Sequence, residues 1–322
     1  MLKNLKLRGI INKTKVIMNA NSQSTKETTS KNLSHWTEDA PLIFKIARWW
    51  TKYAPRGKGW VPRKLGRLFC KGMTSIIWTR AKAQLAIDPN NLEIYCDAWA
   101  HGGTWDSHVL DTCLNVLKKD DIFYDIGASA GIYSIEVAKV FNDTIIVHAF
   151  EPQPSLTHCI RISVALNSFR NVHVHEILLG NKEGITELYI PNNSIKASLI
   201  PSQKAARTIN CSITTLDSFI AVTKPPHPTI IKIDVEGAEM NVFYGAKKTL
   251  ETNTPVIILE ADENMQRFNY THASLFNFLC KYADYTFYFI SKDKRISIVS
   301  DFTNASDGNY LALPPSRKHT LS

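Results

Sequence analysis

Acidic residues stand at the ends of four short apolar runs, a position where acids are rare unless they have a role. They are Asp125, Glu151, Asp234 with Glu236, and Glu260 with Asp262. If each run is a strand of one parallel sheet, the acids gather at the sheet edge where ligands bind. Carboxylates in such a place can hold hydroxyl or ammonium groups, and can take a proton from a reacting hydroxyl.

The stretch around the first of these acids predicts a cofactor site. It reads I-F-Y-D-I-G-A-S-A-G-I-Y-S-I-E over 122–136, which indicates a strand, a turn of small residues and a helix. Small residues let a ligand approach the backbone, and the free N–H groups of a helix start bind anions. Dinucleotide-binding turns show G-x-G-x-x-G, a pattern that this turn does not complete. The residues expected to bind the cofactor here are Gly127, Ala128, Ser129 and Gly131.

Two acids narrow the identity of this cofactor. Asp125 directly precedes the turn, where it would repel a pyrophosphate but would suit the ammonium group of a methionine-like ligand. About 20 residues beyond the turn, the apolar run 144–150 ends in Glu151, which is placed to hold ribose hydroxyls. Methionine and ribose occur together in S-adenosylmethionine. We therefore expect a methyltransferase that uses this cofactor.

A later run carries a resemblance to a known family. Residues 230–239 read I-I-K-I-D-V-E-G-A-E. With D-I-G-A-S-A-G at 125–131 and F-E-P at 150–152, this run resembles the FkbM family of S-adenosylmethionine-dependent O-methyltransferases. The resemblance implies a hydroxyl acceptor on a sugar, glycan or natural product, and it adds Pro152 to the cofactor site. The family usually has Asn where Ser129 stands, so we expect one polar contact to the cofactor to differ.

Candidates for the acceptor chemistry lie near the third and fourth of these acidic positions. Methyl transfer is an in-line displacement at carbon, in which the protein aligns the nucleophile and removes its proton. Asp234 and Glu236 are the candidates for the base. Strand alternation sends Lys232 to the same face as Asp234, so a purely structural ion pair between them is the alternative. On the acceptor side we expect Lys232, His101 and Glu260.

Motifs for metals and disulfides are missing from the sequence. No pair of histidines is spaced with the acids as metal ligands are, so we expect no required metal. Magnesium-dependent O-methyltransferases are the alternative, because acids cluster at the site. The six cysteines are dispersed and form no C-x-x-C pair, which predicts reduced core residues.

The net charge of +9 is concentrated near the N-terminus. Residues 1–80 contain 17 Lys and Arg against three acids, whereas the remainder contains 21 basic and 26 acidic residues. A nucleic-acid enzyme normally carries its positive surface on the catalytic part. We therefore expect a small-molecule or glycan acceptor and no nucleic acid.

The order of apolar and amphipathic segments predicts an α/β fold. Apolar runs and helical patterns alternate from 122 onward, which indicates a mostly parallel sheet with helices on both faces. The resemblance implies a Rossmann-like class I methyltransferase fold, with seven strands and an antiparallel edge pair. Strands are expected near 122–126, 144–150, 171–178, 229–234, 255–260, 284–290 and 308–313, with extra strands near 185–190 and 209–214. Helices are expected near 131–140, 154–167, 238–250 and 272–282.

Composition divides the chain into three parts. Residues 1–35 are rich in Lys, Asn, Ser and Thr, which predicts a disordered basic tail. Residues 36–118 predict an N-terminal extension of helix and hairpin, and residues 119–316 the S-adenosylmethionine-dependent methyltransferase domain. Residues 42–71 mix aromatic and basic side chains. They form either a helix packed on the domain or a peripheral contact with an anionic membrane.

Location and alternative functions follow from the same features. No apolar run approaches the length of about 20 residues that a membrane span needs, and the N-terminus lacks the apolar core of a signal peptide. We expect a cytoplasmic protein, peripheral at a membrane if the basic segment makes that contact. Two other functions stay open. One is a Rossmann-type oxidoreductase, which the turn disfavours, and the other is a non-catalytic protein of this fold that docks on a membrane or polyanion.

Overall fold

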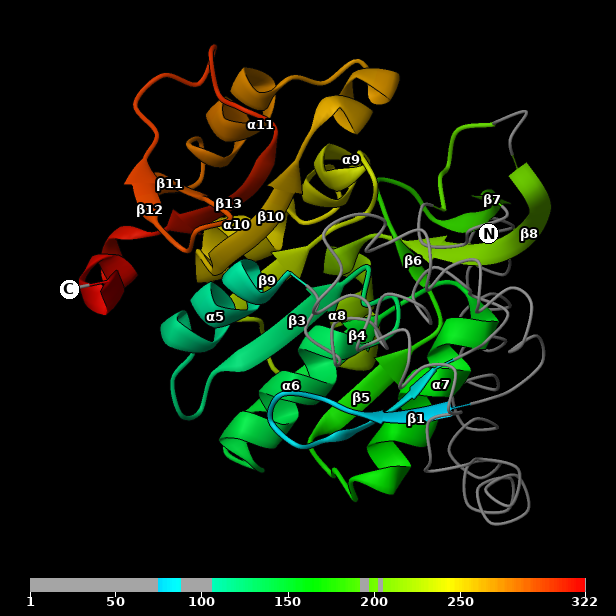
Figure 1. The fold of residues 1–322 in the computed structure, drawn as a ribbon. Helices are drawn as coiled ribbons and strands as arrows, with labels where there is room; N and C mark the ends of the chain where they lie inside the picture. The colour runs from blue at the N-terminus through cyan, green and yellow to red at the C-terminus, as the bar shows by residue number, and fades with distance from the viewer. Residues whose placement is uncertain (1–74, 88–105, 192–196, 202–204, 322) are drawn as a thin grey trace, which may run out of the picture.

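The central sheet is built from the apolar, β-branched runs of the chain (Figure 1). Five strands pair in parallel in the order β10-β9-β3-β4-β5. They are β3 (Ile122–Ile126), β4 (Ile146–Phe150), β5 (Val172–His175), β9 (Ile230–Ile233) and β10 (Val256–Ala261). Because their carboxyl ends meet at one edge, the acids that follow the strands are brought together.

The computed structural model describes residues 75–87, 106–191, 197–201 and 205–321. The expected tail, the basic segment 42–71, His101 and most of the expected extension lie outside the described residues. All strands of the central sheet fall within the domain expected over 119–316. The boundaries of the three parts stay predictions.

An antiparallel edge completes the sheet beside β10. β13 (Gly308–Leu313) pairs with β10 and with β11 (Thr286–Ile290), as expected for the edge pair. β12 (Ile296–Ile298) pairs with β11 and makes the sheet eight-stranded, one strand more than expected. This extra strand has only three residues, and Ile298 is 68% exposed. Its Ile-Ser-Ile alternation is too short to predict a strand from the sequence.

Helices cover both faces of the sheet, as the alternation predicts (Figure 1). One face carries α5 (Ser107–Val116), α6 (Ile132–Phe141) and α7 (Pro154–Leu166). The other carries α8 (Leu216–Thr223), α9 (Glu239–Tyr244), α10 (Lys247–Asn253) and α11 (His272–Leu279). Consecutive strand residues serve opposite faces: Phe123 packs with α5 and α6, and Tyr124 with α8. Among the helices that the structure describes, none is long and apolar enough to cross a membrane.

Two smaller sheets lie outside the central one. β1 (Ser75–Trp78) and β2 (Gln84–Ile87) form an antiparallel hairpin, and β2 packs on α7. β6 (Leu178–Leu179), β7 (Gly184–Pro191) and β8 (Ala205–Thr214) form a three-stranded sheet in which β7 and β8 extend away from the core (Figure 1). Short 3-10 helices, η2 (Glu263–Phe268) and η3 (Pro315–Leu321), follow β10 and β13.

The helix expected over 238–250 is split into α9 and α10 by a turn at Gly245. A Cβ at Gly245 would lie 2.0 Å from the carbonyl oxygen of Gly180. The backbone of this turn therefore packs directly on the chain that follows β6. A helical pattern in the sequence does not report such a contact, so the sequence predicted one continuous helix.

Candidate active site

The small-residue turn between β3 and α6 is fastened to the tips of the neighbouring strands. The backbone N–H of Gly127 donates to the carbonyl oxygen of Phe150 at 3.0 Å. A Cβ at Gly127, where φ is +77°, would lie 1.9 Å from the carbonyl oxygen of Asp234. A Cβ at Gly131 would lie 2.8 Å from Ile160 Cγ1 on α7. Both glycines are therefore required by packing within the protein, in addition to any approach of a ligand.

Glu151, at the tip of β4, is only 4% exposed and shapes the same turn. Its two carboxylate oxygens accept hydrogen bonds from the N–H of Ser129 at 3.0 Å and of Gln153 at 2.9 Å. Burial raises the pKa of Glu151 to about 7, although both N–H donors favour the charged form. Each carboxylate oxygen has a second lone pair. Glu151 can therefore also accept hydrogen bonds from hydroxyl groups of a ligand.

A cavity of about 100 Å³ lies between this turn and the tip of β9. This volume is below the range of about 300–1,000 Å³ typical of pockets for whole ligands, so the cavity fits one part of a larger molecule. Its position beside Glu151 fits the ribose of S-adenosylmethionine. The predicted site residues on its wall are Gly127, Ser129, Glu151, Pro152, Asp234 and Glu236. The predicted cofactor residues that are not on this wall are Asp125, Ala128 and Gly131.

The apolar part of the cavity wall comes from residues that sequence reasoning missed. They are Phe150, Leu178, Leu179, Leu188 and Leu199. Most belong to the three-stranded sheet or the segment beside it and carry no motif, so only the topology brings them to the turn. Apolar side chains in this place suit the flat faces of a ring such as adenine.

The ammonium group of Lys232 lies close to two carboxylates, those of Asp125 and Asp234. Lys232 Nζ lies 3.7 Å from Asp125 Oδ1 and 3.4 Å from Asp234 Oδ2. It also lies 4.8 Å from the ring centroid of Tyr133. Burial would lower the pKa of Lys232, but the carboxylates of Asp234 and Asp125 outweigh burial and raise that pKa. The ion pair considered for Lys232 and Asp234 is therefore present, and a second carboxylate shares the ammonium.

Asp125 does not reach the cavity. Its side chain is fully buried, and Oδ2 accepts a hydrogen bond from Ser134 Oγ at 2.7 Å. Its other oxygen, Oδ1, is buried without a hydrogen bond and has Lys232 as its nearest cation. Burial raises the pKa of Asp125, against the lowering effect of Lys232. The structure thus places Asp125 against Lys232, and its contact with a cofactor ammonium stays a prediction.

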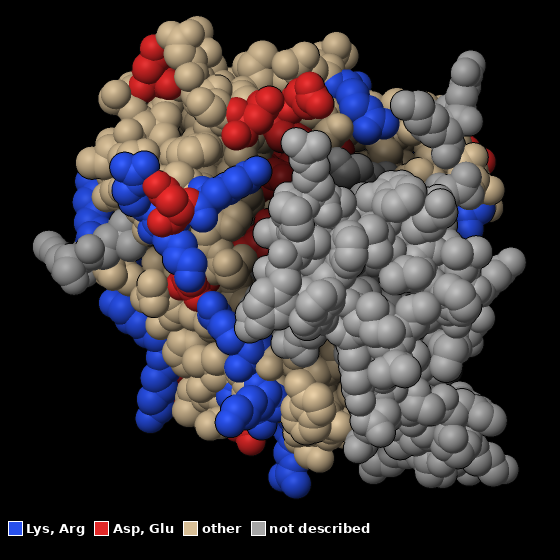
Figure 2. Space-filling view, in the orientation of Figure 1, with Lys and Arg blue, Asp and Glu red and all other residues tan. Residues whose placement is uncertain are grey.

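Four acids meet at the tips of β9 and β10. The side chain of Asp234 is 37% exposed, and Glu236, Glu260 and Asp262 are half-buried. The pairing of β9 with β10 places Glu260 next to Asp234. Burial, followed by the charges of Asp234 and Asp262, raises the pKa of Glu260. Figure 2 shows acidic side chains set back in a hollow on this face of the molecule.

The motif that follows Asp234 is a tight turn fixed by Glu239. Glu239 Oε1 accepts hydrogen bonds from the N–H of Val235 at 3.0 Å and of Gly237 at 3.2 Å. Glu239 thus fastens the turn that precedes α9. This turn holds Glu236, whose φ is +56°, at the cavity wall.

Within the described residues, no group of three or more His, Cys, Asp or Glu side chains is placed to hold a metal ion. The expectation of a reaction without a required metal stays a prediction. Lys232, expected on the acceptor side, is 6% exposed and faces two carboxylates. Its contact with an acceptor also stays a prediction.

The sequence of this chain is similar to proteins of one family. The family described as the methyltransferase FkbM domain matches residues 125–287, about half of the chain. A protein named Methyltransferase 1 from Beauveria bassiana (strain ARSEF 2860) is 23% identical over 158 residues, which are 42% of this chain and 63% of that protein. The chain therefore spans less than two thirds of the length of this relative.

Two solved structures are similar to this chain over part of its length. A methyltransferase FkbM from Methylobacillus flagellatus KT is 16% identical, with a TM-score of 0.44, over 70% of this chain and 53% of that chain. A tRNA (uracil-54, C5)-methyltransferase from Pyrococcus abyssi, in complex with S-adenosyl-L-homocysteine, is 12% identical. Its TM-score is 0.38, over 74% of this chain and 43% of that chain.

Proposed function

Because this chain belongs to the family of FkbM methyltransferase domains, we propose that it transfers a methyl group from S-adenosylmethionine to a hydroxyl oxygen of a glycan or natural product. The fold is the Rossmann-like fold of class I methyltransferases. The observation that supports the proposal most directly is that one cavity is lined by both groups of predicted residues. Glu151 lies on one wall, and Asp234 with Glu236 lies on the other. One wall suits a ribose, and the other suits a reacting hydroxyl.

The side of the cavity formed by β3 and β4 would bind the cofactor. Glu151 would accept hydrogen bonds from the ribose hydroxyls, and the leucines of the smaller sheet would contact the adenine. The turn itself is fixed before binding, because Glu151 already accepts the N–H of Ser129. Such preorganisation lowers the entropy lost when the ligand binds.

The acceptor would react at the side of the cavity formed by β9 and β10. S-adenosylmethionine supplies a methyl group on a positively charged sulfur, which is already reactive toward a nucleophile. A hydroxyl oxygen needs alignment and a group that takes its proton as the oxygen–carbon bond forms. We assign this role to Asp234, which is partly exposed on the cavity wall and held at its Oδ2 by Lys232. Glu236, in the turn that follows Asp234, is the second candidate for the group that takes the proton.

The proposal is tested by transfer of a labelled methyl group to matched acceptors. Uncharged glycosides present hydroxyls, and the corresponding amino sugars present an amine in place of one hydroxyl. We expect transfer of the labelled methyl group to the glycosides, and no higher transfer to the amino sugars. Transfer only to the amine would contradict an oxygen acceptor. Binding of S-adenosylhomocysteine without transfer to any acceptor would instead support the non-catalytic alternative.

The remaining expectations about partners and location stay proposals. A glycan or other small-molecule acceptor, rather than nucleic acid, is supported by the acids around the cavity. A peripheral membrane contact would come from residues 42–71, which lie outside the described residues. Flotation of the full-length protein with anionic vesicles, compared with a variant in which the basic residues of this segment are replaced by Ser, tests that contact.

A further inference from the structure

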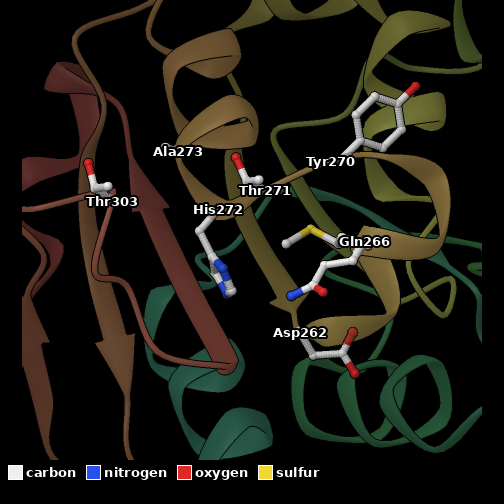
Figure 3. Close-up of a pocket in the computed structure, with 8 residues that line it drawn as sticks. Asp262, Gln266, Tyr270, Thr271, His272, Ala273 and Thr303 are labelled. Atoms are coloured by element: carbon white, nitrogen blue, oxygen red, sulfur yellow. The ribbon is translucent and has the colours of Figure 1, made fainter.

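A second cavity lies beyond the tip of β10 (Figure 3). Its volume is about 280 Å³. It is formed by the end of β10, η2, the start of α11 and the loop that precedes β13. The residues that line it are Asp262, Met265, Gln266, Tyr270, Thr271, His272, Ala273 and Thr303.

We propose that this second cavity binds one uncharged, hydroxyl-rich ring of the acceptor, as in a neutral glycoside. The inference rests on the proposed function, because it places the acceptor of that same reaction. The volume is at the lower end of the range of about 300–1,000 Å³ for ligand pockets, which suits a single ring rather than a nucleotide sugar.

Polar groups converge on this cavity from three elements. Figure 3 shows the side chains of Gln266 and His272 pointing toward a common space, with Asp262 beside it on the cavity wall. Gln266 is exposed and makes no hydrogen bond through its side chain to any described residue, so its amide is available both as donor and as acceptor. A sugar hydroxyl also donates and accepts, and it would find both partners here.

One ring nitrogen of His272 already donates a hydrogen bond within the protein. Its Nε2 lies 3.0 Å from the carbonyl oxygen of Ala261, which can only accept, so Nε2 carries the proton. In the neutral ring Nδ1 is then an acceptor. The same Nε2 lies 3.5 Å from Asp307 Oδ1, a second group that favours a proton there. In this tautomer His272 offers an acceptor for a hydroxyl.

Apolar groups form another part of the lining. Met265 is 1% exposed, and it lines the cavity together with Ala273. The hydroxyl of Tyr270 is bonded elsewhere, because it donates to Asn241 Oδ1 at 3.0 Å. Carbon–hydrogen groups of a sugar ring can pack on such surfaces while its hydroxyls reach the polar side chains.

The charge around the cavity disfavours an anionic acceptor. Asp262 lies on the wall, Asp307 approaches His272, and Glu260 precedes Asp262 by two residues. The nearby Arg267 donates to Ser198 Oγ at 3.1 Å and is not on the cavity wall. A phosphate at this position would face these carboxylates, which costs free energy.

One residue connects this cavity to the cofactor cavity. Asn264 donates from its backbone N–H to Asp262 Oδ1 at 2.9 Å and from its side chain to Asp262 Oδ2 at 2.7 Å. The same side-chain amide lies 3.4 Å from Glu236 Oε2, and Glu236 lines the cofactor cavity. Asn264 therefore links a residue of one cavity wall to a residue of the other, which places the second cavity beside the side of the cofactor cavity assigned to the acceptor.

The test compares three probes and two variants. The probes are methyl glucoside, its 6-phosphate and its 6-deoxy analogue, followed by the galacto and manno series. The 6-deoxy compound separates the loss of a hydroxyl from the gain of charge. For at least one of the three sugars, we expect kcat/KM for methyl transfer to the neutral glycoside to be at least tenfold above that for its 6-phosphate. The kcat/KM for the 6-deoxy analogue should differ from that of the neutral glycoside by less than tenfold. A preferred 6-phosphate in every series would overturn the proposal.

The variant Gln266→Leu removes the amide, and Asn277→Leu is its control on the exposed side of α11, away from the cavity. One lost hydrogen bond of about 1–1.5 kcal/mol corresponds to a rise in KM of about five- to thirteenfold for Gln266→Leu. We expect no change for the control, and unchanged affinity for S-adenosylhomocysteine in both. Equal KM values in wild type and Gln266→Leu would overturn the assignment of this cavity.

Failure of the inference can be told apart from failure of the proposed function. If S-adenosylhomocysteine does not bind, the proposed function is wrong. If it binds but no probe is methylated, saturation-transfer NMR of the same glycosides with the cofactor-bound protein decides. A signal that Gln266→Leu removes and Asn277→Leu keeps supports the inference. No signal from any neutral glycoside overturns it.

Discussion

The two halves of the site are built in different ways. On the cofactor side, Asp125 and Glu151 are almost completely buried, and Glu151 bonds to backbone N–H groups. On the acceptor side, Asp234 is 37% exposed in its side chain, and Glu236 and Asp262 are half-buried. These acids contact mainly other side chains, such as Asn264. A backbone-fixed half suits one constant ligand, whereas side-chain contacts can change with the acceptor at little cost to the fold.

The largest effect is expected on the acceptor side, from Asp234→Asn. General-base contributions are typically about 10²–10⁴-fold, so turnover should fall in that range. Affinity for S-adenosylhomocysteine should stay within twofold, because Asp125 still neutralises Lys232. Glu236→Gln, measured in parallel by labelled methyl transfer, shows which of the two carboxylates takes the proton. Full turnover in both variants would move the base to Glu260 or His101.

A large effect on stability is expected on the cofactor side, from Gly127→Ala. The added Cβ meets the carbonyl oxygen of Asp234 at 1.9 Å. The control is Gly184→Ala, which also has a positive φ but nothing within 4 Å of the added Cβ. Because collisions in packed regions typically cost about 1–3 kcal/mol, Gly127→Ala should be less stable than the control by that amount. Equal free energies of unfolding from denaturant titrations would show that the turn is loosely packed.

A smaller effect is expected from pH. In the proposed site, ribose hydroxyls would donate to Glu151 and favour its charged form, but burial raises the pKa of Glu151 in the free protein to about 7. Below this pH a proton must leave before the cofactor binds. Affinity for S-adenosylhomocysteine should therefore fall by about tenfold per pH unit below 7 and level off above it. Glu151→Gln should bind about 1–3 kcal/mol more weakly at pH 8 and lose this pH dependence. An unchanged pH profile in Glu151→Gln would remove the carboxylate from ribose binding.

The smallest effect is expected from Ser129→Asn. Ser129 has a φ of +52°, in the left-handed region that Asn tolerates better than Ser. Ser168, with a φ of +57°, offers a matched position outside the cavity. Each variant should raise the melting temperature by about 1–3 °C, which corresponds to less than about 1 kcal/mol. A gain at Ser168 with a loss at Ser129 would show that the Ser129 hydroxyl has a role of its own.

Much of the fold could be predicted because it depends on local patterns. The strands near 122–126 and 255–260 are apolar runs followed by acids, and the structure places β3 and β10 there. β12 was missed because its alternation, Ile-Ser-Ile, is only three residues long. The break at Gly245 was missed because its cause is the distant carbonyl of Gly180.

The candidate site divides in the same way. Glu151 and Asp234 follow strands directly, so the sheet brings them to one cavity as the sequence predicted. The burial of Asp125 could not be predicted, because it depends on Lys232 from a strand about 100 residues later in the chain. The second cavity is formed by three segments after β10 that carry no motif, so it could not be predicted from the sequence.

Calorimetric titration with S-adenosylhomocysteine examines the assigned cofactor without the need for an acceptor. We expect one binding site per chain, weaker binding at pH 6 than at pH 8, and much weaker binding of NAD under the same conditions. Absence of binding by both S-adenosylmethionine and S-adenosylhomocysteine at millimolar concentration, or tighter binding of NAD, would contradict the assignment of this cofactor.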